Sequence, residues 1–270
     1  MSMNDIIKEN MFAIADKMAR FNALREFIQT LILKFIEENG YSKDLAFVGG
    51  TAMRFIYDLQ RFSEDLDFSQ ISQGSFSFEK FTAEVVDHFA SIGISAEQKT
   101  KAVRNVKIAL LKFPGLMLEN GLTHRKDQKL LIKLDVDTKP PLGFATEVSF
   151  IQKRMPMNIM HFDQPSLFAG KLHAILMRQY TKGRDFYDFM WFVGHKIVPN
   201  YNLLKNALSQ STQQMTELDE VRLRDMLKKR METVNWKKAA DEVTQFLVDK
   251  SEAKYLTSKI FDQLIEKATL

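Results

Sequence analysis

The chain has 270 residues, of which 45% are hydrophobic, so it can bury the core of one large domain or of two smaller ones. It contains no cysteine, which excludes disulfides, cysteine-bound zinc, iron–sulfur clusters and a thiol nucleophile. The net charge of +4 and a sequence pI near 9.0 are compatible with a polyanionic partner.

Residues 4–39 have the apolar spacing of a helix in two pieces, and Gly40 is a typical residue at which a helix ends. The first residues lack the basic segment and the apolar run of a secretory signal. Apolar runs elsewhere are far shorter than the ~18 residues of a membrane span. We therefore expect a cytoplasmic protein without a membrane partner.

A pair of glycines separates the next two predicted elements. Residues 45–48 are an apolar run typical of a buried strand, and residues 51–57 have the pattern of a helix. At Gly49 and Gly50 an anionic group could therefore approach the peptide N–H groups at the start of that helix. Thr51 is a candidate N-cap or phosphate donor. Taken alone, the glycine pair is equally typical of an ordinary turn.

Two carboxylates follow this helix. In a predicted strand over residues 65–68, Asp65 and Asp67 alternate with Leu66 and Phe68, so both carboxylates point to one face. Neighbouring negative charges repel each other unless a cation lies between them, and hard oxygen ligands suit Mg²⁺ or Mn²⁺. An isolated Asp-x-Asp is usually a solvated edge or a helix cap. In this order, however, the glycine turn and the carboxylates predict chemistry on a nucleoside triphosphate.

The middle of the chain is predicted to be rich in strands. Residues 78–92 have the pattern of an amphipathic helix, and strand-like runs follow at 94–100, 103–112, 130–137 and 145–151. Two-metal nucleotidyl transfer needs a third acidic ligand, and the run 130–137 contains two candidates. We favour Asp135, because Asp137 at the end of the run is readily explained as a turn residue.

The same region carries a one-sided charge. Its basic residues are Lys99, Lys101, Arg104, Lys107, Lys112, Arg125, Lys126, Lys129 and Lys133, with only Glu119 and Asp127 as acidic neighbours. They could form a surface that binds RNA or phosphate. They could equally be a solvated sheet face on which lysines discourage edge pairing.

From Pro165 onward the periodicity is helical, with predicted helices at 165–179, 183–195, 201–209, 216–231, 235–248 and 251–269. We therefore expect an α+β protein: a mixed-sheet domain with flanking helices over residues 1–162, followed by an all-helical domain over residues 163–270. Lys171 and Arg178 would share a helix face that could reach a triphosphate. Alternatively, Lys171 extends into solvent, and Arg184 forms an ordinary ion pair with Asp188.

Together these motifs resemble the AbiEii/AbiGii toxin family of nucleotidyltransferases and, more remotely, the DNA polymerase β-like superfamily. The resemblance covers residues 45–193. It rests on Gly49-Gly50-Thr51, Arg61-x-Ser63-x-Asp65-x-Asp67, the strand with Asp135, Lys171-Leu172-x-Ala174, and Lys182-x-Arg184-Asp185-x-x-Asp188.

The resemblance implies a mixed sheet with the metal carboxylates at its centre, a helical domain that closes the active-site cleft, and NTP with Mg²⁺. Asp65, Asp67 and Asp135 would bind the metal. Lys171 would bind the triphosphate, and Asp188 matches an important family acid. The remaining residues assigned to the nucleotide site are Gly49, Gly50, Thr51, Arg61, Ser63, Arg178, Lys182, Arg184 and Asp185.

Known members include toxins of bacterial toxin–antitoxin and phage-defence systems, and some add nucleotides to the 3′ end of tRNA. We therefore expect a metal-dependent nucleotidyltransferase that moves NMP from an NTP to an acceptor hydroxyl, with RNA as the expected acceptor and a cognate antitoxin as a further partner. Two alternatives stay open: a small-molecule nucleotidyltransferase resembling those that modify aminoglycosides, and a non-catalytic module that binds nucleotide or RNA.

Overall fold

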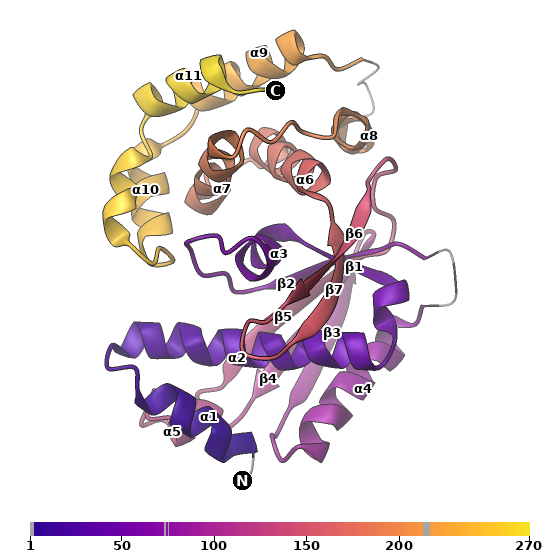
Figure 1. Ribbon diagram of the computed structural model, residues 1–270, viewed down its shortest axis with the longest axis vertical. Helices are drawn as coiled ribbons and strands as arrows, with labels where there is room; N and C mark the ends of the chain where they lie inside the picture. Colours follow the sequence, from indigo (N-terminus) through magenta and orange to yellow (C-terminus); the bar gives the residue numbers. More distant parts are fainter. Residues whose placement is uncertain (1–2, 73, 75, 213–216) are drawn as a thin grey trace. The chain divides into compact units, whose positions relative to one another are not determined.

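The computed structural model describes residues 3–72, 74, 76–212 and 217–270 (Figure 1). The chain forms two compact units, which are treated separately below. The first unit comprises Met1–Phe47, Glu64–Lys139 and Val148–His161, and the second comprises Val48–Ser63, Pro140–Glu147 and Phe162–Leu270. Within the described residues, no helix is long and apolar enough to cross a membrane.

A seven-stranded mixed sheet, in the order β3-β4-β5-β2-β1-β7-β6, dominates the first unit. Its strands are β1 (Leu45–Val48), β2 (Leu66–Gln70), β3 (Glu97–Val103), β4 (Val106–Phe113), β5 (Leu130–Asp137), β6 (Thr146–Ile151) and β7 (Met157–Phe162). β2 is parallel to β5 and β1 is parallel to β7, whereas β4 is antiparallel to both of its neighbours, β3 and β5.

Helices α1 (Met3–Phe12), α2 (Lys17–Glu38), α4 (Phe78–Ser91) and the short α5 (Leu116–Glu119) accompany this sheet (Figure 1). Side chains define where two of them begin: Asp16 accepts a hydrogen bond from the third residue of α2, and Ser77 does the same for α4. The ring of Phe89 in α4 contacts Phe113 of β4 edge-on, 4.8 Å between centroids, at the apolar face of the sheet.

The side chains of β5 alternate between an apolar and a polar face of the sheet. Its residues Leu130, Ile132, Leu134 and Val136 are buried, whereas the alternate residues from 131 to 137 are half-buried or exposed. Because neighbouring strands continue this alternation, Leu66 and Phe68 of β2 are buried while Asp67 is half-buried. The apolar face belongs to the core, and the polar face is left for charged side chains.

The second unit is helical. It contains α3 (Gly49–Ile56), α6 (Gln164–Met177), α7 (Gly183–Gly194), α8 (Tyr201–Thr212), α9 (Glu220–Glu232), α10 (Trp236–Thr244), the 3₁₀ helix η2 (Lys250–Tyr255) and α11 (Ser258–Lys267). Aromatic rings form its core: Phe168 stacks on Phe192 at 4.6 Å, and Phe186 and Trp236 both contact Phe261.

The predicted α+β fold with a mixed sheet and flanking helices is confirmed. Strand β7 was not expected, because Met157 and Asn158 are weak strand formers and helical periodicity follows directly after it. The helix predicted over 216–231 starts at a residue outside the described ranges, and α9 begins at Glu220 behind the cap Asp219. The division at residue 162, with a helical domain that closes the cleft, stays a prediction.

Candidate active site

The predicted glycine turn begins helix α3. Gly49 has a φ of 78°, a left-handed conformation that side chains disfavour, and it is the first residue of the helix. The N-cap position is Val48, which makes no side-chain cap, and Thr51 is fully buried within the first turn. The prediction of Thr51 as N-cap is therefore wrong, because the helix begins two residues earlier. Its role toward phosphate stays a prediction.

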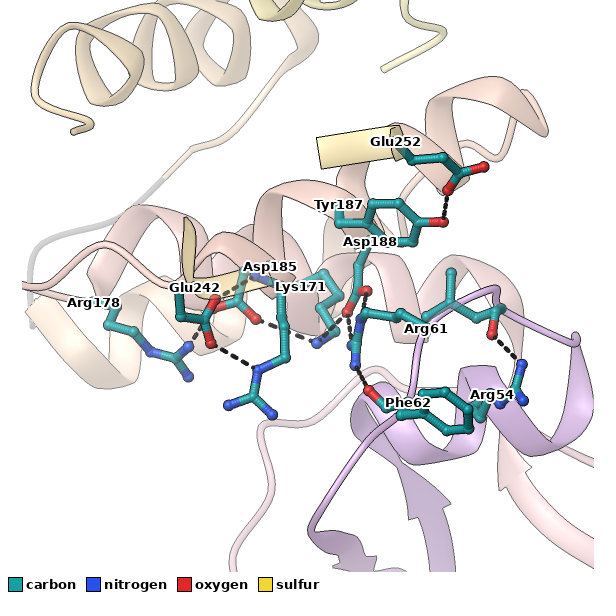
Figure 2. Close-up of polar contacts among 12 residues, drawn as sticks. Arg54, Arg61, Phe62, Lys171, Arg178, Asp185, Tyr187, Asp188, Glu242 and Glu252 are labelled. Carbon is teal, nitrogen blue, oxygen red and sulfur yellow. Dashed lines mark hydrogen bonds and ion pairs between the residues drawn. The ribbon is translucent and has the colours of Figure 1, made fainter. Parts of the chain in front are cut away.

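Gly50 makes room for an arginine. A Cβ atom at this position would lie 2.3 Å from Nη2 of Arg61, far inside van der Waals contact. That guanidinium is held in place, because its Nε and Nη2 donate to Oδ1 and Oδ2 of Asp188, both at 2.6 Å, and its Nη1 donates to the carbonyl of Phe62 at 3.0 Å (Figure 2). Gly50 is thus needed for packing against Arg61.

A cation cluster continues from this ion pair, formed by Arg61, Lys171, Arg178, Asp185 and Asp188 (Figure 2). Lys171 Nζ lies 2.6 Å from Oδ2 of Asp188 and 3.3 Å from Oδ1 of Asp185, and Arg178 binds the other oxygen of Asp185. Three cations face two carboxylates, which leaves one positive charge in excess. The cluster can therefore attract an anion.

Asp188 is the buried centre of the cation cluster, with no exposed surface. Burial alone would raise the pKa of this carboxyl, but Arg61 and Lys171 outweigh burial and hold its pKa below the ordinary value. Asp188 is therefore ionised at neutral pH.

Lys182 lies at the start of α7. Burial lowers the pKa of its ammonium group, and the positive charge of the neighbouring Arg184 lowers it further.

One of the two simpler explanations of this region is wrong. Lys171 does not extend into solvent, since its side chain is only 13% exposed and bonds two carboxylates. Arg184 pairs with Glu242 of α10: its Nε donates at 3.0 Å, and its guanidinium lies 3.8 Å from the ring centroid of Phe246. Arg184 thus holds α7 against α10.

The carboxylates predicted to bind metal lie on the polar face of the sheet. We call Asp65, Asp67 and Asp135, together with Lys133, the carboxylate face. Asp67 of β2 is in parallel register with Asp135 of β5, so their side chains leave the sheet side by side, and Asp65 directly precedes β2. Lys133 donates a hydrogen bond to Oδ2 of Asp135.

The other oxygen of Asp135 is distinctive. Oδ1 is buried and accepts no hydrogen bond from the residues that the structure describes. Burial raises the pKa of Asp135 above its ordinary value, although Lys133 acts in the opposite direction. A buried carboxylate oxygen without a donor is a suitable ligand for a cation.

The donor set of the carboxylate face suits a divalent cation. Hard oxygen ligands in register and the unpartnered Oδ1 of Asp135 fit Mg²⁺ or Mn²⁺. In the described part of the chain, no group of three or more His, Cys, Asp or Glu side chains is placed so that it could hold a metal ion. The fit therefore rests on Asp67 and Asp135 as neighbours, with Asp65 close enough in sequence and space to influence the charge of Asp135.

The remaining residues predicted to bind the nucleotide lie in the second unit. Ser63, Lys182 and Asp185 belong to the second unit, and Ser63 and Asp185 are buried. Asp137 accepts a hydrogen bond from the backbone N–H of Lys139 at 3.0 Å, as expected of a turn residue. The sequence contained no signal for the pairing of Arg61 with Asp188, because these residues are 127 positions apart.

We call the basic residues between positions 99 and 133 the basic stretch. Acidic residues from other parts of the chain neutralise some of its charge. Lys107 bonds Glu79 at 3.0 Å, and Lys129 bonds Glu97 at 2.8 Å. Every residue of β3 is exposed, including Lys99 and Lys101. Part of the stretch is therefore a solvated sheet edge. Binding of RNA or phosphate by the exposed lysines of β3 stays a prediction.

The glycine turn yields the first prediction. Gly50→Ala should lower the melting temperature clearly, because its methyl group and the buried guanidinium of Arg61 cannot occupy the same space. Gly170→Ala is the matched control: Gly170 also lies in a helix, has no neighbour within 4 Å of its Cβ position, and should be neutral or slightly stabilising. Thermal unfolding of both variants measures the difference, and equal melting temperatures would contradict the packing role of Gly50.

Comparisons with known proteins give the family of the chain and solved structures with a similar fold. The family model described as "Nucleotidyl transferase AbiEii toxin, Type IV TA system" matches residues 31–267. The search of curated proteins found no match. Solved structures with a similar fold include MenT4, a nucleotidyltransferase toxin from Mycobacterium tuberculosis H37Rv, with a TM-score of 0.55, 16% identity, and coverage of 98% of this chain and 90% of that one.

Two structures from Helicobacter pylori are similar in the same way. JHP933 has a TM-score of 0.53 and 18% identity over 91% of this chain and 92% of that chain. A protein described as a putative nucleotidyltransferase has a TM-score of 0.53 and 18% identity over 90% of this chain and 94% of that chain. At these identities the likeness establishes the fold.

Proposed function

Because the chain belongs to the family of AbiEii nucleotidyltransferase toxins, we propose that it transfers a nucleoside monophosphate from an NTP to an acceptor hydroxyl, with release of pyrophosphate. The observation that carries this proposal is the register of Asp67 with Asp135 on the polar face of the sheet. Oδ1 of Asp135 is buried and accepts no hydrogen bond from the described residues, which supports a cation as its ligand.

Asp65, Asp67 and Asp135 would hold that cation, which we propose to be Mg²⁺ or Mn²⁺. When bound, a divalent cation supplies Lewis-acid stabilisation of the phosphate charge and lowers the pKa of a coordinated hydroxyl. The neighbouring side chains determine which carboxylate oxygens are available to the cation. Lys133 keeps Oδ2 of Asp135 occupied, so that Oδ1 is the oxygen available to a ligand.

For the triphosphate we propose the glycine turn and the cation cluster. The backbone N–H groups at the start of α3 provide donors at the positive end of a helix. Lys171 and Arg178 bring positive charge that is already oriented by Asp185 and Asp188, so little reorganisation is needed when negative charge develops on the leaving pyrophosphate. Arg61 acts indirectly, since it is buried and each of its three guanidinium nitrogens donates to Asp188 or to the carbonyl of Phe62. The predicted contacts of Ser63, Lys182, Arg184 and Asp185 with the nucleotide belong to the same proposal.

The acceptor that we propose is RNA, at a 3′ end such as that of tRNA, in keeping with the toxin class of the family. The exposed lysines of β3 support a polyanionic acceptor. A role in a toxin–antitoxin or phage-defence system, with a cognate antitoxin as partner, follows from the same membership. Transfer to a small molecule and binding without catalysis are the alternatives.

One assay separates these three functions. The protein is incubated with each α-labelled NTP, Mg²⁺, total tRNA and, separately, an aminoglycoside. We expect label in the RNA, and we expect EDTA to abolish it because the proposed carboxylate face needs a divalent cation to act. Label in the aminoglycoside would favour the small-molecule alternative, and no transfer under any condition would contradict the proposed enzyme.

A further inference from the structure

Strand β5 brings a cation of its own to the carboxylate face. Lys133 and Asp135 are two residues apart in β5, so their side chains leave the sheet on the same side. The ammonium group of Lys133 donates a hydrogen bond to Oδ2 of Asp135 and forms an ion pair with it. A positive charge that belongs to the chain itself therefore binds one of the proposed metal ligands.

The same ammonium group also lies near the other two proposed ligands. Asp67 pairs with Asp135 in the parallel register of β2 and β5. Asp65 and Lys133 lie two residues before this pair, and both side chains line one cavity of 380 Å³. The negative charges of all three carboxylates act on the Lys133 ammonium group. This cation is thus placed among the carboxylates that would hold a metal ion.

A divalent cation and the Lys133 ammonium group would use the same carboxylates. While Lys133 bonds Oδ2 of Asp135, Oδ1 is the oxygen left for a metal ion, and coordination by both oxygens is blocked. The two cations also repel each other at this short range. A lysine that already supplies counter-charge agrees with the finding that no three described His, Cys, Asp or Glu side chains are placed to hold a metal ion.

We propose that Lys133 is a built-in competitor of the divalent cation, which neutralises part of the carboxylate face before a metal ion binds and weakens the binding of a free metal ion. If Lys133 instead only oriented Asp135 as a ligand, its removal would have the opposite effect. Loss of a competitor strengthens metal binding, whereas loss of an orienting partner weakens it. The assignment rests on the proposed function, because it takes the three carboxylates as the ligands of the cation.

The test uses Lys133→Met, which removes the ammonium group and keeps a long, unbranched side chain. Lys129→Met is the matched control. Lys129 lines the same cavity and is similarly exposed, 32% against 39%, but it is held by Glu97 at 2.8 Å. Lys133→Arg retains the positive charge. Binding of Mn²⁺ is measured without NTP, from the electron paramagnetic resonance signal of the free ion.

The Kd of Lys133→Met for Mn²⁺ should be about tenfold lower than that of the wild-type protein, the size expected when one unit charge is removed near a divalent ion in a site that water screens. Lys129→Met and Lys133→Arg should stay within about twofold of wild type, because charges farther away are screened and arginine keeps the competing charge. Adding Asp67→Asn to Lys133→Met should cancel the gain. Equal or weaker Mn²⁺ binding by Lys133→Met would overturn the proposal.

Thermal unfolding gives a second readout on the same proteins. In EDTA, Lys133→Met should melt below the wild-type protein, because its carboxylates have lost their counter-charge. Millimolar Mn²⁺ should raise its melting temperature by more than that of wild type, since a ligand of the folded state stabilises it according to its affinity. A variant that gains no more from Mn²⁺ than wild type does would contradict the competing role of Lys133.

The binding measurements separate this proposal from the proposed function. Tighter Mn²⁺ binding by Lys133→Met supports the role of Lys133 even when the transfer assay shows no product. Mn²⁺ binding by wild type that Lys133→Met does not strengthen overturns the role of Lys133 and leaves the metal site in place. Mn²⁺ binding that Asp67→Asn does not weaken in either background overturns both, because the ion then lies away from the carboxylate face.

Discussion

Replacing Asp67 by Asn should reduce kcat/KM for nucleotide transfer by about a thousandfold or more, while the protein stays folded. The side chain is half-buried on the polar face of the sheet, and Asn has nearly the same shape as Asp. The substitution therefore removes a charged oxygen ligand and leaves the packing intact. Initial rates with a labelled NTP and thermal unfolding of the same preparations measure both effects.

Asp137→Asn is the matched control. Asp137 lies two residues beyond Asp135 on the same face of β5, is also half-buried, and bonds the backbone of Lys139. We expect nearly wild-type activity, because its carboxylate serves the turn. Full activity in Asp67→Asn, or equal losses in both variants, would contradict the assignment of the metal ligands to Asp65, Asp67 and Asp135.

Replacing Arg61 by Ala should destabilise the protein by about 3–5 kcal/mol, the range for removal of one partner from a buried ion pair. Asp188 would be left without exposed surface, and Lys171 would be its remaining cation. The free energy of unfolding from urea titration measures this loss. Activity should fall as well, because Asp188 orients Lys171.

The exposed pair of Arg125 and Asp127 provides the control for Arg61. Both side chains are at least 70% exposed, so Arg125→Ala should not change the free energy of unfolding measurably.

Acid should lower the free energy of unfolding of the wild-type protein through protonation of Asp188. Because its folded pKa lies below the unfolded value of about 3.9, its contribution is complete above that value and is lost as the pH falls through the folded pKa. An Arg61→Ala variant as stable as wild type would show that the ion pair does not hold this unit together.

Local patterns in the sequence were sufficient for most elements of the fold. The alternation in residues 130–137 identified β5 with its bounds, because one apolar face and one polar face have a period of two. Helix α2 was similarly clear from its apolar spacing and the glycine after it. The predicted helix at 251–269 was too long, because Thr257 caps a new helix and the preceding residues form a 3₁₀ turn.

The candidate site was only partly predictable. A metal site needs a further carboxylate, so Asp135 could be inferred as a partner of Asp67 from the chemistry. The register that places the two side by side depends on the order of the strands in the sheet, which no local pattern determines. The role of Gly50 could not be inferred from the sequence. The guanidinium of Arg61 lies where a Cβ atom of residue 50 would be, and Asp188, far away in the sequence, holds it there.

The most direct test of the proposed site is a crystal structure with Mn²⁺ and a non-hydrolysable NTP analogue. We predict an anomalous peak bound by carboxylate oxygens of Asp67 and Asp135, including the Oδ1 atom that now has no partner among the described residues. We also predict phosphate density at the start of α3. A peak at other residues, or nucleotide bound away from Gly49 and Lys171, would contradict the proposed site.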